Sequence, residues 1–571
     1  MTPSSYSFQL SAARWLAFCA AAGTALAATG KEPPAPAVAD ATPAQQSQPT
    51  IYIREFRVLG TKELPKIDVE ETVYPFLGPG RTFKDIEDAA AALTKAYQDK
   101  GFKAAQVMVP EQDGRGGVVN LQAYEGKVGS LRITGAKYFL PSRIRAQARS
   151  LAEGKVINFN NIGPEIVKLN GLADRRVEPK LTASLEPGIY DIELAVKDIS
   201  PLHGSIELNN RNSANTTDLR LNTSISYANL WQLGHTLGAS YQMSPEDRSE
   251  VKVFSAFYML RMPQWDSFSL MLNGTKQDSN VSTLGGAAVA GRGEILGLRG
   301  IFTLPSMDGF FQSLSVGFDY KNFDQNVIIG GVTDVTPISY YPVNAAWDGT
   351  WVHTKEVAAP TDKDPTATER VETGTTELTV GLTVGLRGTG STQTSLERNR
   401  FGSDGNFIYI RGSLAHTQKL PKDWELYAKI HGQAGDQPLV NSEQFSGGGI
   451  GTARGYLEAE AQGDSGLFTT IELRTPSLLP KTKKGGDPKN EDDETGHEWR
   501  FYGFFDAGTL TLHDTLPSQA SSFRLASTGF GSEIRLWNHF SGTLEIALPL
   551  TSLTNTKAHD PRVNFRVGSD F

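Results

Sequence analysis

Beyond residue 202, hydrophobic and polar residues alternate along the chain in short runs that are separated by turns or polar segments. One run, for example, has Leu219, Leu221 and Ile225 at alternate positions, with polar residues between them. Such alternation predicts β-strands with one apolar and one polar face. We count about fifteen clear runs and place a sixteenth at 345–356. Many have roughly the 9–11 residues that a tilted strand needs to cross a bilayer.

The connections between these runs alternate between short and long. Tight turns are predicted at 229–235, 261–267 and 419–424. Long polar loops are predicted at 278–291, 325–344, 389–404 and 437–465. Short turns on one side, long loops on the other and an even number of strands are typical of bacterial outer-membrane barrels. We therefore predict a mainly β fold, in which residues 201–571 form a 16-stranded transmembrane antiparallel β-barrel.

Two connections do not fit this asymmetry. Residues 357–374 and 480–498 are longer than the tight turns expected on their side of the barrel. For the first of them, either the segment is an insertion or a strand boundary is misplaced.

The last nine residues are predicted to form the closing strand of the barrel. Val563, Phe565, Val567 and Phe571 share one face, and polar residues and glycine share the other. An apolar outer face that ends in an aromatic residue is what a lipid-facing strand requires. We interpret Phe565, Val567 and Phe571 as a signal for the barrel-assembly machinery. The alternative is an edge strand of a soluble β-sandwich, which the loop asymmetry and the N-terminus disfavour.

Residues 51–127 and 128–200 have a different pattern, in which strands and helices alternate. In the first segment, residues 51–60 are expected to form one strand, and the following helix has Ile86, Leu93 and Tyr97 on one face. A weaker helix is expected between them. Both segments have the order strand, helix, helix, strand, strand, and GSLRITGA in the second repeats REFRVLGT in the first. We infer an internal duplication that produces two small α+β domains.

The N-terminus has the features of a secretory signal peptide at residues 1–27. Arg14 precedes a short apolar stretch that ends in Ala25-Leu26-Ala27, a small-residue cleavage pattern. Residues 28–50 are rich in Pro and Ala and are interpreted as a flexible linker. Cys19 is the only cysteine of the chain, so no disulfide or cysteine metal site is expected after cleavage. No later apolar stretch is long enough to predict a transmembrane helix.

Composition narrows the possible partners. The 571 residues carry a formal net charge of −8, and basic residues cluster only at Lys481–Lys484, beside the acidic run 491–494. We interpret this segment as a solvated loop and predict no nucleic-acid partner. No metal or other cofactor is predicted, and the chain is not expected to be an enzyme.

The stretch 451–466 offers two candidates for a functional residue. It ends in Gly463-Asp464-Ser465-Gly466, a tetrapeptide that also surrounds the nucleophile of chymotrypsin-like proteases. Ser465, however, lies in a loop before an alternating strand, and none of the nine histidines has a recognisable general-base context. The other candidate is Arg454.

A carboxylate is predicted to face the barrel lumen near residue 506. In the run 499–506, alternation places Trp499, Phe501 and Phe505 on one face and Asp506 on the other. If the apolar face contacts lipid, the carboxylate of Asp506 points into the lumen. In that confined space it requires a cationic partner, best of all a guanidinium that binds both oxygens.

Two α+β modules before such a barrel resemble the TpsB transporters of two-partner secretion, the hemolysin secretion/activation family of the POTRA-plus-barrel superfamily. The resemblance covers 51–571 and rests on two motifs. Residues 442–466 resemble the long sixth loop of the family with its Val-Arg-Gly-Tyr core, in which Ala453 replaces the Val. Residues 501–510 resemble the Phe-x-Asp-x-Gly strand motif, as Phe504, Asp506 and Gly508.

The resemblance implies a contact between these motifs, which we call the loop–barrel lock. Loop 437–465 would fold into the lumen so that Arg454 reaches Asp506. Gly455 would permit a tight turn, and Tyr456 would pack against the barrel wall. Exchanging the two charges, Arg454→Asp with Asp506→Arg, is then expected to recover some function if the pair is direct.

The resemblance also implies a function and a location. The chain would lie in the outer membrane of a Gram-negative bacterium, with its POTRA-like domains, 51–127 and 128–200, in the periplasm. It would capture a large, unfolded exoprotein through an N-terminal secretion domain and secrete it through the barrel without ATP. The alternatives are an insertase of the same superfamily, which usually has more POTRA domains, and a passive porin-like channel, which needs none.

Overall fold

The computed structural model describes residues 50–571 except 114, 263–264, 266, 280, 283–288, 291, 330–331, 359–367, 481, 484–493 and 518. The predicted signal peptide 1–27, nearly all of the linker 28–50 and most of the charged segment 481–494 lie outside the described residues. The chain divides into two compact units, one of which ends at Ser200 while the other contains Pro201–Phe571.

The first α+β module packs two helices against a three-stranded sheet. Its elements are β2 (Glu55–Leu59), α1 (Lys66–Val73), α2 (Phe83–Asp99), β4 (Gln106–Met108) and β5 (Val118–Tyr124). The central strand β5 pairs parallel with β2 and antiparallel with β4. Helix α2 begins with a capping box between Thr82 and Asp85. It buries Ile86, Leu93 and Tyr97 in the core of the module, as the periodicity predicts.

The prediction of one strand over residues 51–60 is wrong. The segment forms β1 (Ile51–Ile53), which pairs with β3 (Gly78–Arg81), and then β2 in a different sheet. The sequence carries the reason, because the apolar positions shift from odd numbers, Ile51 and Ile53, to even numbers, Phe56 and Val58. A strand cannot change phase in this way without a break.

The second module repeats this arrangement. Its elements are β6 (Lys127–Thr134), α3 (Pro141–Gln147), α4 (Phe159–Leu169), β7 (Arg175–Ala183) and β8 (Ile189–Asp198). The sheet order β6–β8–β7, with β6 parallel to β8, is that of β2–β5–β4 in the first module. A separate hydrophobic core forms around residues such as Ile144, Leu151 and Ile166.

A carboxylate at the end of the central strand supports the duplication further. Glu125 follows β5 and accepts hydrogen bonds from the backbone N–H groups of Lys62 (2.5 Å) and Glu63 (2.7 Å), just after β2. The Tyr97 hydroxyl also donates to Glu125, and burial raises the pKa of Tyr97 to about 12. Asp198, at the end of β8, likewise accepts from backbone N–H groups that follow β6. In both modules the carboxylate fixes the loop after the first strand.

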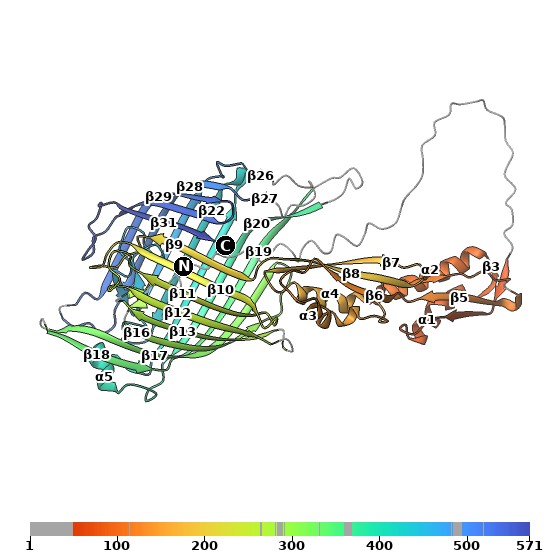
Figure 1. The fold of residues 1–571 in the computed structure, drawn as a ribbon, viewed down its shortest axis with the longest axis horizontal. Coiled ribbons are helices and arrows are strands. Elements are labelled where there is room, and N and C mark those ends of the chain that lie inside the picture. The colour runs from red at the N-terminus through yellow and green to blue at the C-terminus, as the bar shows by residue number, and fades with distance from the viewer. Residues whose placement is uncertain are drawn as a thin grey trace, which may run out of the picture. The chain divides into compact units, whose positions relative to one another are not determined.

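Sixteen antiparallel strands close the barrel, which confirms the predicted number (Figure 1). Its strands are β9 (Leu202–Asn209), β10 (Arg220–Leu230), β11 (His235–Met243), β12 (Lys252–Arg261), β13 (Phe268–Asp278), β16 (Arg292–Thr303), β17 (Phe310–Ile329), β18 with β19 (Val332–Tyr340, Val343–Ala358), β20 (Thr368–Val384), β21 (Ile408–Lys419), β22 (Glu425–Gly435), β25 (Ser465–Arg474), β28 (Glu498–Thr511), β29 (Ser522–Leu536), β30 (Phe540–Pro549) and β31 (Arg562–Asp570). The last strand, β31, pairs with β9.

Strands β18 and β19 are two parts of one broken strand. Both pair with β17 in a single register, since Lys321 faces Tyr340 and Phe318 faces Val343. The break falls at Pro342, which has no backbone N–H to donate. Its carbonyl still accepts from the Asp319 N–H at 3.0 Å.

Three predicted connections differ from the structure. The loop predicted at 325–344 is mostly the hairpin of β17 and β18, whose β-branched runs flank Gly330 and Gly331, a pair that favours short hairpin turns. In the segment 357–374, β19 continues to Ala358 and β20 begins at Thr368, so strands replace much of the predicted turn; its middle, 359–367, lies outside the described residues. The loop at 389–404 contains a helix, α5 (Gln393–Asn399).

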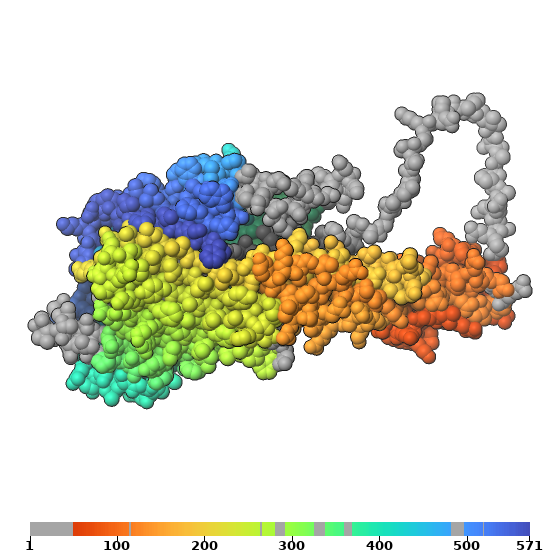
Figure 2. All heavy atoms as spheres, in the orientation of Figure 1, coloured from red at the N-terminus to blue at the C-terminus, as the bar shows by residue number. Residues whose placement is uncertain are grey.

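The outer face of the barrel is apolar. Its strands expose large hydrophobic side chains, among them Leu272, Phe318, Ile410 and Phe530. Figure 2 shows one side of this wall, in the yellow-green and blue parts of the chain. A closed barrel with such a surface has the outer face that contact with lipid requires. Among the described residues, no helix is both long and apolar enough to cross a membrane.

We expect lipid contact to make the outer face sensitive to charge. Leu272, in the middle of β13, is 56% exposed on the outside, and Met271 beside it faces inward. Leu272→Arg is expected to destabilise the barrel by about 2–4 kcal/mol, the cost of a cation at the bilayer midplane. Met271→Glu is the control and should cost less, because it places a charge in the polar lumen, opposite Arg299 of β16. Urea unfolding in lipid vesicles measures both, and equal losses would contradict a lipid-facing Leu272.

Candidate functional site

The long segment between β22 and β25 folds against the inner wall of the barrel. It forms a small hairpin of β23 (Phe445–Gly447) and β24 (Ala461–Gly463), between which the chain turns back. Gly448 and Gly449 have φ values of +104° and +87°, a region in which residues with a side chain are strained. We call residues 437–465 the lumen loop.

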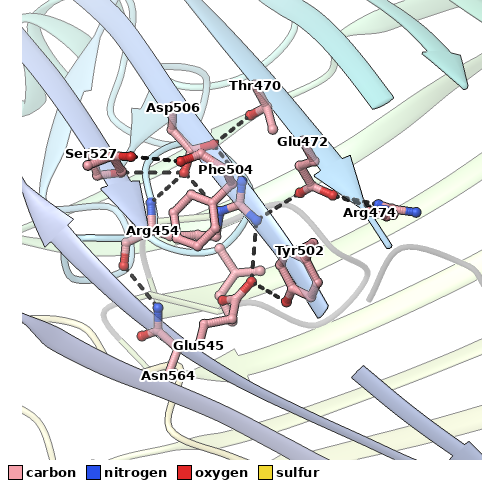
Figure 3. A network of polar contacts seen from close by, with 12 residues as sticks. Arg454, Thr470, Glu472, Arg474, Tyr502, Phe504, Asp506, Ser527, Glu545 and Asn564 are labelled. Carbon is pink, nitrogen blue, oxygen red and sulfur yellow. Dashed lines mark hydrogen bonds and ion pairs between the residues drawn. The ribbon is translucent and has the colours of Figure 1, made fainter. Parts of the chain in front are cut away.

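Arg454, near the tip of the lumen loop, meets Asp506 of β28. Its Nε and Nη2 atoms each donate to a different oxygen of the carboxylate at 2.8 Å, and its backbone N–H donates at 3.2 Å (Figure 3). The residues are 4% and 1% exposed, so this bidentate pair is screened little by solvent. Thr470 and Ser527 also donate to Asp506, at 3.0 Å and 3.4 Å. The structure thus brings together the two residues singled out from the sequence.

Phe504 holds the flat face of the same guanidinium. The Arg454 Cζ atom lies 3.6 Å from the centre of the Phe504 ring, close enough for a cation–π contact. Gly508, two residues after Asp506, lies beneath the ring of Phe468, where an added Cβ would meet a ring carbon at 2.1 Å. The Phe-x-Asp-x-Gly motif therefore supplies a ring for the cation, a carboxylate, and space for a neighbouring ring.

Gly455 and Tyr456 attach the loop to the wall next to Arg454. A Cβ at Gly455 would lie 2.9 Å from the Pro549 nitrogen, so close approach to β30, and not a left-handed φ, requires the glycine. Tyr456 is 1% exposed. Its hydroxyl donates toward the Thr551 carbonyl at 2.7 Å and accepts from the Ala526 N–H at 3.3 Å. This phenol bridges β29 and the segment after β30.

Sequence reasoning missed two further carboxylates beside Arg454. Glu472 of β25 accepts from Nη1 at 2.7 Å, and Glu545 of β30 accepts from the same atom at 3.3 Å (Figure 3). Arg474 also donates to Glu472, and the Tyr502 hydroxyl donates to Glu545 at 2.8 Å. The alternation of β25 and β30 would have placed both glutamates inside the barrel. Their height relative to Asp506 depends on strand register, which the alternation does not give.

A second set of polar contacts holds the beginning of the lumen loop and was also missed. Glu443 is fully buried. It accepts from the Lys321 ammonium at 2.5 Å and from the hydroxyls of Tyr340 and Tyr409 at 2.6 Å and 2.7 Å. These partners lie on β17, β18 and β21, whereas those of Arg454 lie on β25, β28 and β30. The lumen loop is therefore attached to two separate groups of strands.

The Gly-Asp-Ser-Gly tetrapeptide lies where the lumen loop rejoins the barrel. The Asp464 carboxylate accepts from the Leu439 N–H at 2.9 Å and from the His513 N–H at 2.7 Å. The Ser465 hydroxyl accepts from the Gly435 N–H at 3.0 Å. These hydrogen bonds connect the two ends of the loop. Among the described residues, no group of three His, Cys, Asp or Glu side chains is placed to hold a metal ion.

The lumen loop leaves free space beside Arg454. A cavity of about 300 Å³ is bordered by the guanidinium and by charged side chains of both signs, among them Lys429, Glu472, Arg474 and Glu533. At the chain end, Val567 and Phe571 are 43% and 67% exposed on the outer face, and Phe565 is half-buried. Their role as an assembly signal stays a prediction.

Two family models match the chain. A model of the ShlB-type POTRA domain matches residues 51–126. The model described as haemolysin secretion/activation protein ShlB/FhaC/HecB matches residues 364–533, which include the lumen loop and β28.

Proteins named CdiB are also similar to this chain. The outer membrane transporter CdiB of Escherichia coli (strain 536 / UPEC) is 25% identical over 188 residues, which are 33% of this chain and only 32% of that relative. The CdiB of Dickeya dadantii (strain 3937) is 20% identical over 74% of this chain and 72% of its own length. The structure of CdiB from Escherichia coli has a TM-score of 0.58 at 19% identity and covers 94% of this chain and 93% of that one. This last likeness concerns the fold.

Removing the Arg454 cation should release the tip of the lumen loop. Arg454→Gln leaves Asp506 and Glu545 without their cation and Glu472 with Arg474 alone, a loss on the order of 3–5 kcal/mol for a broken buried pair. Arg454→Lys keeps the charge without the planar fork and should give an intermediate result. The rate of maleimide labelling at Thr452→Cys, in a Cys19→Ser background, reports release. Labelling as slow in Arg454→Gln as in the parent would contradict this expectation.

The exchange of the Arg454 and Asp506 charges, which is expected from the sequence to recover some function, should fail beside Glu472 and Glu545. In Arg454→Asp with Asp506→Arg, the new carboxylate would face Glu472 and Glu545, while the new guanidinium sits on the wall. Like charges in a buried site destabilise one another, so the double variant should label at least as fast as either single variant. Restoration of the parent rate would show that the two glutamates matter little.

The Glu443 contacts should break independently of the Arg454 contacts. Glu443→Gln leaves the buried Lys321 ammonium without its counter-charge. It is expected to expose a reporter at Val440→Cys but not one at Thr452→Cys. Tyr409→Phe removes a single hydrogen bond, worth about 1 kcal/mol, and serves as the mild control. Equal exposure of both reporters in Glu443→Gln would show that the two attachments act as one.

Proposed function

The chain belongs to the TpsB family of outer-membrane transporters, the haemolysin secretion/activation family, and from this premise we propose that it secretes one large exoprotein through its barrel. The observation that carries the proposal is the pairing, in one chain, of a ShlB-type POTRA domain with a barrel segment that matches the ShlB/FhaC/HecB model. POTRA domains offer a place to hold a client, and the barrel offers a route across the membrane. The client in this proposal is an exoprotein with an N-terminal secretion domain.

Capture would use the edges of the two POTRA sheets. In the first module, β2 and β4 lie at the edges of the sheet, and in the second module β6 and β7 do so. An edge strand presents backbone N–H and C=O groups that an extended client can pair with by strand addition. An unfolded chain has these groups free, whereas a folded one has already paired most of them. Selection for unfolded clients therefore follows from the chemistry of a strand edge.

Transport would be driven without ATP by binding and folding. A chain that folds after it leaves the barrel cannot easily return through the lumen, so folding outside makes passage directional. Ordering of a disordered segment costs entropy that contacts at its destination must offset. This places the driving force in the client, whereas the barrel supplies the path.

The lumen loop would control that path. Arg454, Asp506 and the neighbouring glutamates hold the loop against the wall inside the lumen, in the space through which a client would have to pass. Passage therefore requires the loop to shift. In this proposal the loop–barrel lock keeps the resting barrel closed to leakage and yields when a client enters. A purely structural role would affect the yield of barrels and not channel opening.

Two other functions predict different outcomes of one experiment. Proteins of the culture medium and of the outer membrane are compared between cells with and without this chain. Secretion of one client predicts the loss of one large polypeptide from the medium. An insertase predicts a general loss of other barrels from the membrane, and a passive channel changes neither fraction.

The same experiment can test the role of the loop. Cells that carry Arg454→Gln or Met271→Glu are compared at equal amounts of assembled barrel. The proposal expects the first variant to secrete less client or to admit more of a membrane-impermeant antibiotic, and the second to behave as the parent. Secretion and permeability equal to the parent in Arg454→Gln would contradict control by the lock.

A further inference from the structure

The hairpin of β19 and β20 extends beyond the barrel wall. The pairing of β19 with β17 stops at Trp351, and the pairing of β20 with β21 stops at Gly374. Farther out, β19 and β20 still pair with each other over five residues. Among the described residues, no other strand pairs with this part of the hairpin. We call its residues, 354–358 and 368–372, the ribbon.

The ribbon lies at the periplasmic end of the barrel. The first strand, β9, starts at that end with Leu202, directly after the POTRA modules in the chain. Neighbouring strands are antiparallel, so β19 ends and β20 begins at the same end. Most described connections at this end are tight, such as 231–234 between β10 and β11. The ribbon is therefore an addition to the wall at the mouth through which a client would enter.

Ion pairs hold the base of the ribbon on both sides. Arg370 of β20 donates to Asp308, in the turn before β17, at 2.7 Å. On the other side, the Glu372 carboxylate lies 3.4 Å from the ammonium group of Lys419, the last residue of β21. Such exposed pairs contribute little free energy, but they tie the ribbon to both neighbouring connections. Beyond them, residues 355–358 and 368–371 are exposed on both faces.

One edge of the ribbon has backbone groups that no neighbouring strand uses. The Val352 N–H donates to the Gly309 carbonyl at 2.7 Å, in the direction of β17. Backbone groups of successive residues point to opposite sides of a strand, so those of Glu356 and Ala358 point to the same side as those of Val352. Among the described residues, no strand continues β17 beside them. The edge of β19 therefore offers unpaired N–H and C=O groups.

The opposite edge of the ribbon, formed by β20, is partly occupied. The Gln418 amide donates to the Thr373 carbonyl at 2.9 Å, where the edge begins. Lys419 also extends toward this edge to reach Glu372. By the same alternation, the backbone groups of Arg370 point to this side, because those of its neighbours pair with β19. Strand addition is thus less hindered at the edge of β19.

From these contacts we propose that the free edge of β19 in the ribbon binds the client between its capture and its entry into the lumen. This inference rests on the proposed secretion. The occupant is an extended, unfolded polypeptide, because such a chain has a continuous stretch of unpaired backbone groups. The edge has few outward positions, namely Thr354, Glu356 and Ala358. A ladder this short binds weakly, so it can guide a moving chain without retaining it.

Proline substitutions test the edge, with the large polypeptide that cells without this chain fail to release as the readout. Glu356→Pro removes an outward N–H and keeps the bonds between β19 and β20, which Lys355 and Val357 make from the β19 side. At equal amounts of assembled barrel, it should lower secretion on the order of fivefold, the effect of one lost backbone hydrogen bond. Ala358→Pro, on the same edge, should have the same effect.

Two variants are matched controls. Glu356→Ala loses the ion pair with Arg370, at 3.6 Å, but keeps the backbone N–H. Arg370→Pro removes an outward N–H from the opposite edge. Both should secrete like the parent. The inference is overturned if Glu356→Pro secretes like the parent, or if either control loses as much secretion. If cells without the chain release every polypeptide normally, the proposed secretion itself is overturned, and this inference with it.

Discussion

One guanidinium holds together the polar contacts on one side of the barrel lumen. Strands β25, β28 and β30 each direct a carboxylate at the same point, and at that point lies Arg454. Three buried anions so close together would repel one another and lose hydration without compensation. Arg454, with help from Arg474 and Tyr502, makes this arrangement favourable. The wall and the lumen loop are thus electrostatically complementary, and neither is stable in this form without the other.

Much of the fold could be predicted because its signals are local. An alternation of period two fixes which side chains of a strand face outward, and it gave the sixteenth strand at 345–356 inside β19. Repetition of one element order predicted two modules. The fold predictions were wrong where a local signal was overlooked or where the alternation of apolar positions changed phase. Residues 51–60 form two strands because the apolar positions shift at Arg54, and most of 325–344 belongs to the paired strands β17 and β18.

A site residue could be predicted from the sequence only where another residue requires it as a partner. Asp506 faces inward and needs a cation, and a motif names Arg454. Three glutamates also lie inside the barrel, namely Glu472, Glu545 and Glu443. No local feature of the sequence predicts how far along the barrel axis each of them lies. Their meeting points are set by the register of several strands, as with Thr470 opposite Asp506. The register of each strand depends on the offsets between neighbouring strands around the whole barrel. No short stretch of sequence contains that information.

The break at Pro342 has a mechanical consequence. Tyr340 ends β18 just before the break and Lys321 faces it across the hairpin, and both bind the buried Glu443 of the lumen loop. On the far side of the break, β18 is bonded through Ser339 to Ser391, in the segment after β20, while the base of the hairpin is bonded to the lumen loop. A displacement of the hairpin base would disturb the contacts of Glu443, so the position of the hairpin and that of the start of the lumen loop are coupled.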